Sequence, residues 1–515
     1  MVNRFLLFLL LSASSTLFAS DSLSYYLIYF KDKNNSEYAL NRPEEFLSKA
    51  SIERRSKWNI PIQTQDLPVN QSYIKAIQSI DGIHVINSSR WLNALEISSS
   101  SREINIKQIL AFDFVKSLDF LGRQKVYKNQ KIETIEDKYI QRAKELQALK
   151  ADTAELMLDR EQYKKSYEQI QVLNLPELQN RVGRHPNIHI AVFDAGFNDA
   201  YKVPGMEDLL ISNTITKDFV DYDNSVYEDD AHGCKVLSFM KTYNPGTYIG
   251  SAPFAKYTLV RTEQVHSEFP TEEVNWLLAA EFADSLGVDQ IVSSLGYNVF
   301  DDMNLSHTQS DLNGQTSIIA KAANAAYQRG ILVCTSAGNE GMNAWHKIGT
   351  PADAPGVIAI GACNKNGFYA NFSSVGPSSD GRIKPDFIVP GYQVQVASSG
   401  GVYNGNGTSY ATPLFGGAVS NLLALFPKTA LNDIRNALVR SATHRHHPDS
   451  AYGYGIPDLS LAMYFLDSIN TTPNQSDIFW MKDQAVYYNE LNIYYKSNKV
   501  QTVKLLVKEK NKKEI

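Results

Sequence analysis

The sequence predicts an α/β protein whose main part is built on a central, mostly parallel β-sheet. From about residue 186 on, short apolar runs such as IHIAVFDAG, DQIVSSLGY and GVIAIGAC alternate with stretches of helical spacing such as TEEVNWLLAAEFADSLG. Strands that alternate with helices are typical of βαβ units, which build parallel sheets. Ligand sites in such sheets gather at the carboxyl ends of the strands.

Composition supports a globular protein with a large core. Of the 515 residues, 43% are hydrophobic and 20% are charged, and the formal net charge is −5. These fractions are ordinary for globular chains, and the length allows two or three domains at about 150 residues each. A net negative charge does not indicate a positively charged surface that would attract a polyanion, so no nucleic-acid partner is expected.

Residues 1–20 have the pattern of a cleaved signal peptide. Arg4 is followed by the apolar run Phe5 to Leu11 and then by mostly small residues. The run is too short to cross about 30 Å of hydrocarbon, and no later stretch is long and apolar enough to do so. We therefore expect a protein secreted or held at the cell surface or in the periplasm, without a membrane span in its mature form; a buried N-terminal strand is the alternative.

The rest of the chain divides into four parts. Residues 21–125 suggest a small α/β unit, since YYLIYF and HVINSSRWLNALEIS are strand-like and QSYIKAIQSI has helical spacing. Residues 126–170 are charged and helix-favouring with few apolar positions, which predicts a charged helical connector. Residues 171–468 contain the βαβ pattern, and 469–515 form a tyrosine-rich tail expected to be short and β-rich.

Two candidate catalytic residues follow from their positions. Asp194 ends the strand-like run IHIAVFD, and a carboxylate there can orient a histidine and stabilise its charged form. His232 precedes a glycine and an apolar run with helical spacing, so we expect it near a helix N-terminus. Each residue alone also fits a turn or cap.

The strongest single motif is GNGTSYATPLFGGAVSNLLALF, which begins at Gly405. It places Ser409 at the entrance of a helix rich in small residues, where backbone N–H groups can stabilise an oxyanion. The serine needs a base to become a nucleophile, and His232 would supply it. An ordinary serine N-cap is the alternative, but it does not explain the crowding of small residues or the presence of Pro413 within the helix.

Asn339 adds a candidate oxyanion donor. It stands in TSAGNEG after another strand-like run. Its side-chain amide can donate a hydrogen bond to a developing oxyanion. A Gly-Asn turn is the other interpretation.

Together these motifs resemble those of the subtilisin-like serine proteases (subtilase family, peptidase family S8). The order Asp, His, Ser is that of subtilisin and differs from that of chymotrypsin and the α/β-hydrolases, and no G-x-S-x-G elbow surrounds Ser409. The motifs, which span about residues 170 to 465, are DAGF, HGCKV, SSLGY, AGNEG and GTSYATP.

The resemblance implies a subtilisin-like three-layer fold and a role for each motif. Asp194 would orient His232, His232 would act as general base and acid, and Ser409 would be the nucleophile. Asn339 and the Ser409 backbone N–H would form the oxyanion hole.

The resemblance also implies a substrate strand that pairs with the backbone of Ser294, Leu295 and Gly296. Gly296 and Gly338 would allow the two backbones to approach closely. Tight turns at strand ends are the alternative reason for these glycines.

Two residues depart from the family pattern. Ala195 stands where a hydroxyl residue usually follows the aspartate, and Cys234 stands where the family usually has a threonine two residues after the histidine. Cys234 is either a packing residue or a thiol open to oxidation near the active site. The remaining cysteines, Cys334 and Cys363, lie in apolar runs and are expected to be buried thiols; a bond between them depends on geometry and stays open.

The segment before the catalytic part resembles the prodomains of secreted Bacteroidetes-type subtilases, especially in LSKASIERRSKWNI and QDLPVN. The resemblance implies an intramolecular inhibitor and folding aid that is later removed. The exposed connector is a suitable place for that cut. The tail has the position of a secretion-sorting domain but carries no specific motif.

We therefore predict a secreted, self-maturing serine endopeptidase that acts on proteins or peptides. Its chemistry requires no cofactor. Related enzymes often hold structural calcium, but no ligands are assignable here, and the acidic run from Asp218 to Asp230 equally fits a solvated loop. Two alternatives stay open, namely a pseudoprotease that only binds and a peptide ligase that transfers the acyl group to an amine.

Overall fold

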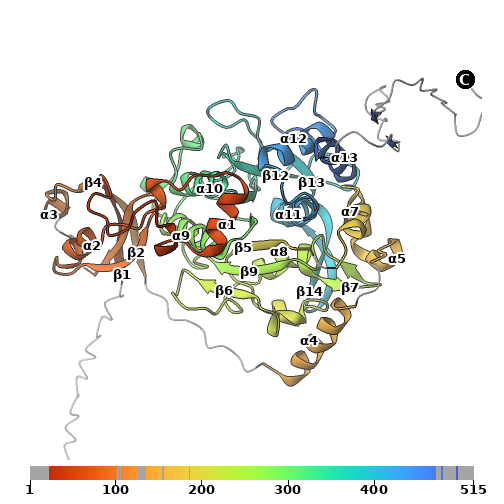
Figure 1. The fold of residues 1–515 in the computed structure, drawn as a ribbon, viewed down its shortest axis with the longest axis horizontal. Helices are drawn as coiled ribbons and strands as arrows, with labels where there is room; N and C mark the ends of the chain where they lie inside the picture. The colour runs from red at the N-terminus through yellow and green to blue at the C-terminus, as the bar shows by residue number, and fades with distance from the viewer. Residues whose placement is uncertain are drawn as a thin grey trace, which may run out of the picture.

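The computed structural model describes residues 22–100, 104, 106–125, 135–152, 156–184, 186–470, 477–479 and 494–496. Within them, a small N-terminal domain lies beside a larger main domain (Figure 1). The predicted signal peptide, residues 1–20, lies outside the described residues, as does most of the predicted tail. Of that tail, β16 (Asp477–Phe479) and β17 (Tyr494–Lys496) are described and pair in antiparallel fashion.

The N-terminal domain is a four-stranded antiparallel sheet with the strand order β2-β3-β1-β4. The strands are β1 (Ser22–Phe30), β2 (His84–Ser89), β3 (Ala94–Ser99) and β4 (Val115–Lys125), and the helices are α1 (Lys49–Lys57), α2 (Gln71–Gln78) and α3 (Ile106–Leu110). Side chains alternate along β1, as the two-residue period of a strand requires. Ile28 packs with Ile77 of α2 and Ile109 of α3, whereas Leu27 packs with the main domain.

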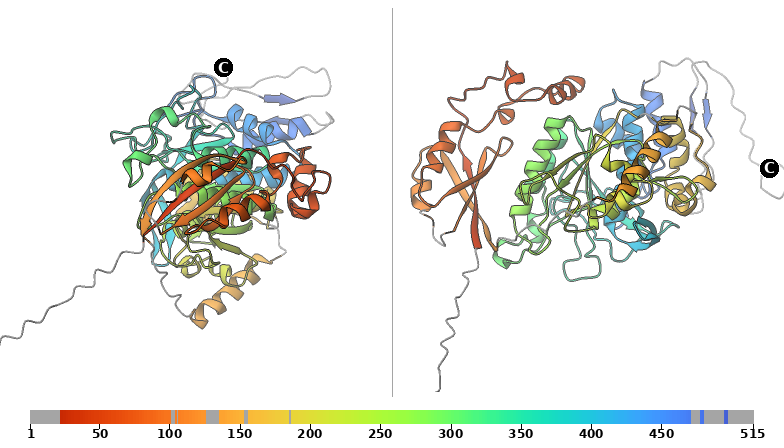
Figure 2. Two further views of the ribbon diagram at one scale, coloured as in Figure 1. Left: turned by 90° about the vertical axis from the view of Figure 1, so that its left-hand side faces the viewer. Right: turned by 90° about the horizontal axis from the view of Figure 1, so that it is seen from below.

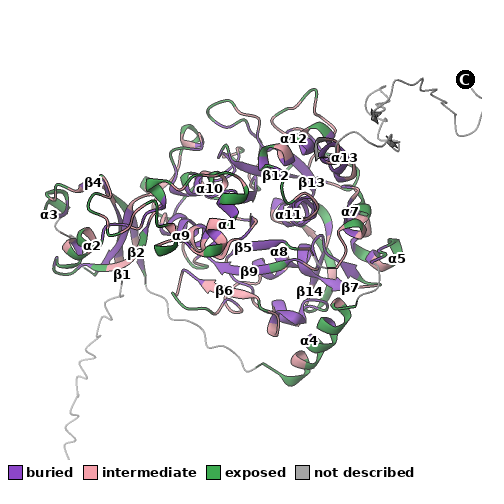
Figure 3. Ribbon diagram, viewed as in Figure 1, coloured by how far each residue is buried: buried purple, intermediate pink, exposed green. Residues whose placement is uncertain are grey.

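The main domain is built on a seven-stranded sheet in which every neighbouring pair is parallel, with the order β13-β12-β11-β10-β5-β9-β6. Its strands are β5 (His189–Asp194), β6 (Ile215–Asp218), β9 (Lys256–Arg261), β10 (Gln290–Ser293), β11 (Leu332–Ser336), β12 (Val357–Cys363) and β13 (Phe387–Pro390). The central strands are buried along their whole length (Figure 3). Helices cover both faces, which is why these strands appear in the sequence as continuous apolar runs.

Two layers of helices enclose this sheet. On the side facing the N-terminal domain lie α9 (Thr271–Leu286) and α10 (Ile318–Gln328). The opposite layer consists of α7 (Leu175–Val182), α8 (His232–Lys241), α11 (Thr408–Leu425), α12 (Leu431–Ser441) and α13 (Leu459–Asn470). Seen from below, the orange sheet faces the green helices, and the blue helices lie on the far side (Figure 2). The predicted α/β fold with a mostly parallel central sheet is confirmed.

The segment expected to be a charged connector packs partly on the main domain. It forms α4 (Asp137–Lys150), α5 (Arg160–Tyr163) and α6 (Tyr167–Gln171). The outer side of α4 is exposed (Figure 3), but Leu146, Leu156 and Tyr163 are buried in the core that the main sheet shares with α8 and α11. Most of this segment therefore belongs structurally to the main domain, while the exact domain boundaries stay predictions.

Three pairs of short elements also belong to the main domain. They are β7 (Tyr243–Asn244) with β8 (Tyr248–Ile249), β14 (Tyr392–Ser398) with β15 (Gly401–Asn406), and the 3-10 helices Ala200–Lys202 and Glu207–Leu210. Among the described residues, no helix combines the length and the apolar character that crossing a membrane requires.

A buried ionic network joins the N-terminal domain to α9. The Asp284 carboxylate accepts hydrogen bonds from Arg54, from Arg55 at 2.9 and 3.0 Å, and from Arg90 at 2.7 Å. On the other side, Asp66 accepts from Arg329 of the main domain at 2.8 Å. Each of these side chains is buried or nearly so. The two domains are thus held together by charges removed from water as well as by apolar packing.

Candidate active site

Asp194 is the last residue of β5 and is completely buried. Its Oδ1 accepts a hydrogen bond from the backbone N–H of Ala195 at 2.9 Å and lies 2.7 Å from Nδ1 of His232. Its Oδ2 is buried and has no hydrogen-bond partner in the described part of the chain. The carboxylate is therefore held against the imidazole through a single oxygen.

His232 is the first residue of α8 and about one third exposed. Its neighbour Gly233 lets the helix start directly against β5, because a Cβ at that position would lie 2.8 Å from Cβ of Asp194. The negative charge of Asp194 raises the pKa of His232 above its usual value, although burial opposes this change. A carboxylate that favours the imidazolium form in this way is what a general base requires once it has taken a proton.

Ser409 is the second residue of α11, whose N-cap is Gly407 with a φ of 156° and no side-chain cap. The alternative of a serine N-cap is therefore wrong. The Ser409 hydroxyl donates to the Ser294 carbonyl at 3.4 Å, and the Ser294 hydroxyl donates to the Ser409 carbonyl at 2.9 Å. Among the described residues, no hydrogen bond joins Ser409 to His232.

The start of α11 nevertheless lies against α8. Tyr410, which follows Ser409, stacks on Phe239 of α8 with ring centres 5.2 Å apart. The charge of Asp194 also contributes to raising the pKa of Tyr410, after burial and Tyr403. Ser409 thus stands in the same region as the Asp194–His232 pair, with its hydroxyl turned toward the end of β10.

Asn339 follows β11 and is fixed by the residue before Ser409. Its side-chain oxygen accepts from the Thr408 backbone N–H at 2.9 Å and from the Thr408 hydroxyl at 3.0 Å. This orientation leaves the amide N–H groups of Asn339 to donate elsewhere. Thr408 was not singled out in the sequence, because its contact with Asn339 joins residues far apart in the chain.

The predicted substrate segment lies directly after β10. Ser294 contacts Ser409 as described above, and the Leu295 carbonyl accepts from Ser336 at 3.4 Å. Gly338 has a φ of 111°, and a Cβ there would lie 2.7 Å from the Ser374 hydroxyl, so only glycine fits. A Cβ at Gly296 would meet only an ordinary contact of 3.5 Å with the Thr350 carbonyl.

Three buried or partly buried carboxyl groups lie next to the site and were not predicted. The carboxyl oxygens of Glu263, Glu268 and Glu272 come within 4.8 Å of one another, a grouping that could hold a metal ion. Burial raises the pKa of Glu263 to about 8 and that of Glu268 to about 7. Of these three residues only Glu272 lies in the first turn of α9, where a glutamate is a favourable charge at the helix dipole.

The acidic run from Asp218 to Asp230 is not simply a solvated loop. Arg261 of β9 forms ion pairs with Asp218, Asp221 and Asp229 at 2.9, 2.6 and 3.0 Å. The backbone N–H of His232 also donates to Asp230 at 2.5 Å. The run is thus anchored to the sheet and helps to fix the start of α8. Structural calcium stays a prediction without assigned ligands.

The cysteines are buried free thiols, as expected for packing residues. Cys334 and Cys363 form no disulfide, which answers the question left open by the sequence. Burial raises the pKa of Cys234 to about 12. Because the thiolate is the reactive form, this structure favours the packing role of Cys234 over that of an oxidation-sensitive thiol.

Comparison with known proteins adds two family matches and several relatives. Residues 185–455 match the subtilase family (peptidase S8), and residues 25–138 match the peptidase S8 propeptide domain of Bacteroidota. Subtilisin NAT of Bacillus subtilis subsp. natto is 28% identical over 298 residues, which cover 57% of this chain and 70% of that protein. The subtilisin of Bacillus pumilus is 28% identical over 290 residues, which cover 56% of this chain and 94% of that protein.

Among solved structures, that of the prenylagaramide maturation protease PagA matches 57% of this chain and 98% of that chain, with 23% identity and a TM-score of 0.45. The family model alone spans more than half of the chain, on the strands and helices described above. The predicted family is therefore confirmed: this chain is a serine peptidase that belongs to the subtilase family and carries a propeptide domain of the Bacteroidota type.

Proposed function

We propose that this protein is a secreted serine endopeptidase that cleaves peptide bonds with Asp194, His232 and Ser409. The observation that carries the proposal is the 2.7 Å contact between the buried Asp194 carboxylate and His232 at the carboxyl end of β5. Ser409 and Asn339 stand at the same end of the sheet, next to β10 and β11. Parallel sheets collect their reactive groups at this edge.

The proposed reaction is acyl transfer in two steps. His232 takes the proton of Ser409, the serine oxygen attacks the peptide carbonyl, and the Asn339 amide and the Ser409 backbone N–H stabilise the oxyanion. The protonated His232 then gives its proton to the leaving amine, and water releases the acyl group. Because the Ser409 hydroxyl donates to Ser294 in this structure, the first step requires it to rotate into another staggered position.

The N-terminal domain is proposed to act as the intramolecular inhibitor until it is cut away. Its strand β4 contacts the loop before α9, where a Cβ at Gly122 would lie 2.4 Å from the Phe269 ring, and the first residue of α9, since Gln124 donates to Thr271 at 2.6 Å. We place the maturation cut between β4 and α4, since the segment after α4 is buried in the main domain. Buried backbone is a poor substrate for proteolysis.

Export through residues 1–20 belongs to the same proposal. The N-terminal sequence of the exported protein tests it, and we expect it to begin after the small residues near Ala19 and Ser20. The substrate strand is proposed to pair with the backbone of Ser294, Leu295 and Gly296. Catalysis is proposed to need no cofactor, and any calcium would serve structure.

The activity is tested by incubating the purified chain and its Ser409→Ala variant with casein. We expect casein cleavage and shortening from the N-terminal side in the wild type alone. A folded, prodomain-free wild type that leaves casein intact would mean that the protein only binds. Adding an amine nucleophile separates hydrolysis from peptide ligation, because a ligase would yield products extended by the amine.

A further inference from the structure

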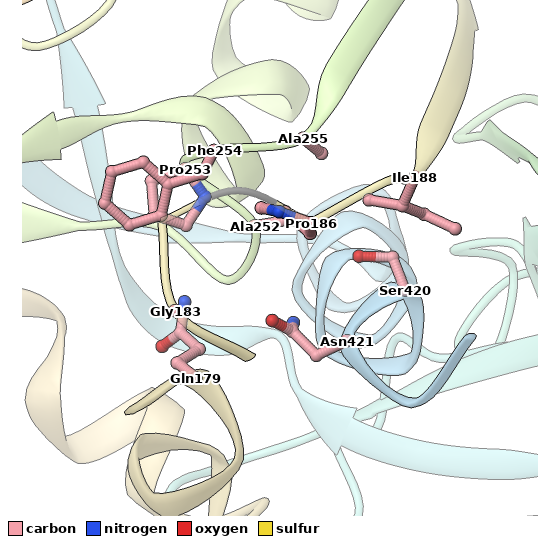
Figure 4. Close-up of a pocket in the computed structure, with 10 residues that line it drawn as sticks. All are labelled: Gln179, Gly183, Pro186, Ile188, Ala252, Pro253, Phe254, Ala255, Ser420 and Asn421. Carbon is pink, nitrogen blue, oxygen red and sulfur yellow. The ribbon is translucent and has the colours of Figure 1, made fainter. Parts of the chain in front are cut away.

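A cavity of about 290 Å³ opens at the amino ends of β6 and β9, the edge of the sheet opposite to Asp194. Its walls come from the end of α4, the end of α8 and the loop before β9. A neighbouring cavity shares Pro253, Phe254 and Ala255 with it but has only about 10 Å³, which is room for one water molecule (Figure 4). Of these two cavities in the described part of the chain, the larger one alone has room for a ligand.

Positive charge dominates the lining of the larger cavity. Lys150 of α4, Lys241 of α8 and Lys256 of β9 line it, whereas Asp208 is its one lining carboxylate. Lys150 and Lys241 both donate to the same oxygen of Asp208, Oδ2, at 3.0 and 3.1 Å. Despite burial, the charges of Lys241 and Lys150 hold the pKa of Asp208 below its usual range, so one negative charge faces three lysines.

Other charges near the cavity do not fully cancel the positive charge of the three lysines. Lys150 and Lys241 end their helices, and a helix C-terminus carries about half a negative charge. Arg184 also lines the cavity and lies 4.0 Å from Asp152, so this pair adds no net charge. When all three lysines are charged, they exceed Asp208 and the two helix ends by about one positive charge.

Two further observations indicate what kind of ligand would fit this cavity. Burial, followed by the charge of Lys241, lowers the pKa of Lys150 to about 7, so an anion bound beside it would favour the charged form of this lysine. In addition, Oδ1 of Asp208 is buried and accepts no hydrogen bond from the described residues. A ligand that satisfies both groups needs several acceptor oxygens for the lysines and one O–H for Asp208.

We propose that this cavity binds a small oxyanion that retains a proton, with hydrogen phosphate as the simplest case, and that the bound anion fastens α4 to the main domain. The anion accepts from Lys150 on α4 and from Lys241 and Lys256 on the main domain, and its own O–H donates to Asp208. The hydroxyls of Ser212 and Thr214, which bond to each other at 2.6 Å, offer further donors in the lining.

The test uses the full chain as its Ser409→Ala variant, so that the segment leading into α4 stays intact. Inorganic phosphate is titrated at constant ionic strength against sodium chloride, and binding is followed by calorimetry and by Tm. We expect saturable binding, a rise in Tm and slower hydrogen exchange in α4. Absence of binding, or a Tm that rises equally in chloride, overturns the proposal.

Two variants and one competing ion test whether phosphate binds in this cavity and whether Asp208 contributes to its binding. Lys256→Met removes an exposed lysine that does not bond to Asp208, so the protein keeps its fold while Kd for phosphate rises at least about tenfold. Lys428→Met changes an exposed lysine that does not line the cavity, and it leaves Kd unchanged. Unaltered binding in Lys256→Met places phosphate elsewhere and overturns the site. Sulfate, which carries no proton at neutral pH, binds at least about tenfold more weakly; equal binding overturns the role of Asp208.

Discussion

At the scale of single residues, the charge of Asp194 controls when His232 can act as a base. Because Asp194 raises the pKa of His232 above its usual value of 6.5, activity is lost as pH falls through a value higher than 6.5. The stability of the folded protein depends on pH in the opposite direction. The Asp194–His232 ion pair stabilises the fold fully below pH 6.5, and this contribution is lost as pH rises through the pKa of His232 in the folded state.

We predict that Asp194→Asn moves the acid limb of kcat/KM to lower pH and lowers kcat by about 10⁴, the loss known for the corresponding change in another serine protease. The pH profile is measured with an activated ester, so that the residual rate stays detectable. An acid limb that does not move would show that another group sets it.

The contact between Asn339 and Thr408 gives a second residue-scale prediction. Asn339→Ala is expected to lower kcat by about 10²–10³ with little change in KM, the size of loss known for such a donor in subtilisin. Thr408→Val removes one of the two donors to the Asn339 oxygen and keeps the backbone N–H. It should therefore cost less than about tenfold in kcat. Equal losses in both variants would contradict a positioning role for Thr408.

Single residues also show what a local sequence pattern can and cannot indicate. Asp194, His232, Asn339 and Ser409 each stand in a short motif next to a strand or helix end, so local pattern finds them. The contact of Ser409 with Ser294 joins residues that are 115 positions apart in the chain. Such proximity is a product of the tertiary fold and leaves no local signal.

At the scale of elements, helix α1 fastens the N-terminal domain to α9 and α10. Arg55 contacts both Asp284 and Asp66 while fully buried. We predict that Arg55→Met makes the cleaved N-terminal domain leave the mature enzyme about 10- to 100-fold faster, because it leaves two buried carboxylates less well paired. Release is followed by native gel after self-processing.

The matched control lies on the same helix. Lys49 and Glu53 form an ion pair at 3.7 Å with both side chains largely exposed, and such pairs contribute little. Lys49→Met should therefore release the domain at the wild-type rate. A release rate in Arg55→Met that equals this control would show that apolar packing alone holds the two domains.

The structural elements also show which features hydrophobic periodicity in the sequence cannot predict. The strands and helices of the main sheet were predicted because buried parallel strands are continuous apolar runs. The burial of Leu156 and Tyr163 was missed, because these isolated apolar residues lie in a short, charged segment with no clear helical stripe. Leu156 and Tyr163 are buried because this segment packs on the main domain.

At the scale of the whole molecule, docking of the N-terminal domain should depend on pH through Glu96. This residue lies in β3, is 2% exposed and neighbours Tyr25 of β1 and Tyr222 of the main domain. Its carboxyl accepts from Asn87 at 3.4 Å, and no described cation pairs with it. Burial raises its pKa from 4.5 to about 7.

A raised carboxyl pKa means that the docked state holds the proton more tightly than the released state. Docking therefore weakens as pH rises from about 4.5 to about 7, by up to about tenfold per pH unit, and then levels off. We predict that Glu96→Gln removes most of this dependence from the release rate of the cleaved domain. An unchanged pH dependence in Glu96→Gln would assign it to other groups, such as Glu263 and Glu268.

Asp194, His232 and Ser409 are proposed to form one nucleophilic centre, which covalent labelling can detect. The processed wild type and the variants Ser409→Ala and His232→Ala are treated with a serine-directed fluorophosphonate, and the labelled peptide is identified by mass spectrometry. We predict one adduct per chain on Ser409 in the wild type, and none in either variant. A folded, prodomain-free wild type without an adduct, or with an adduct on another residue, would contradict this assignment of the active site.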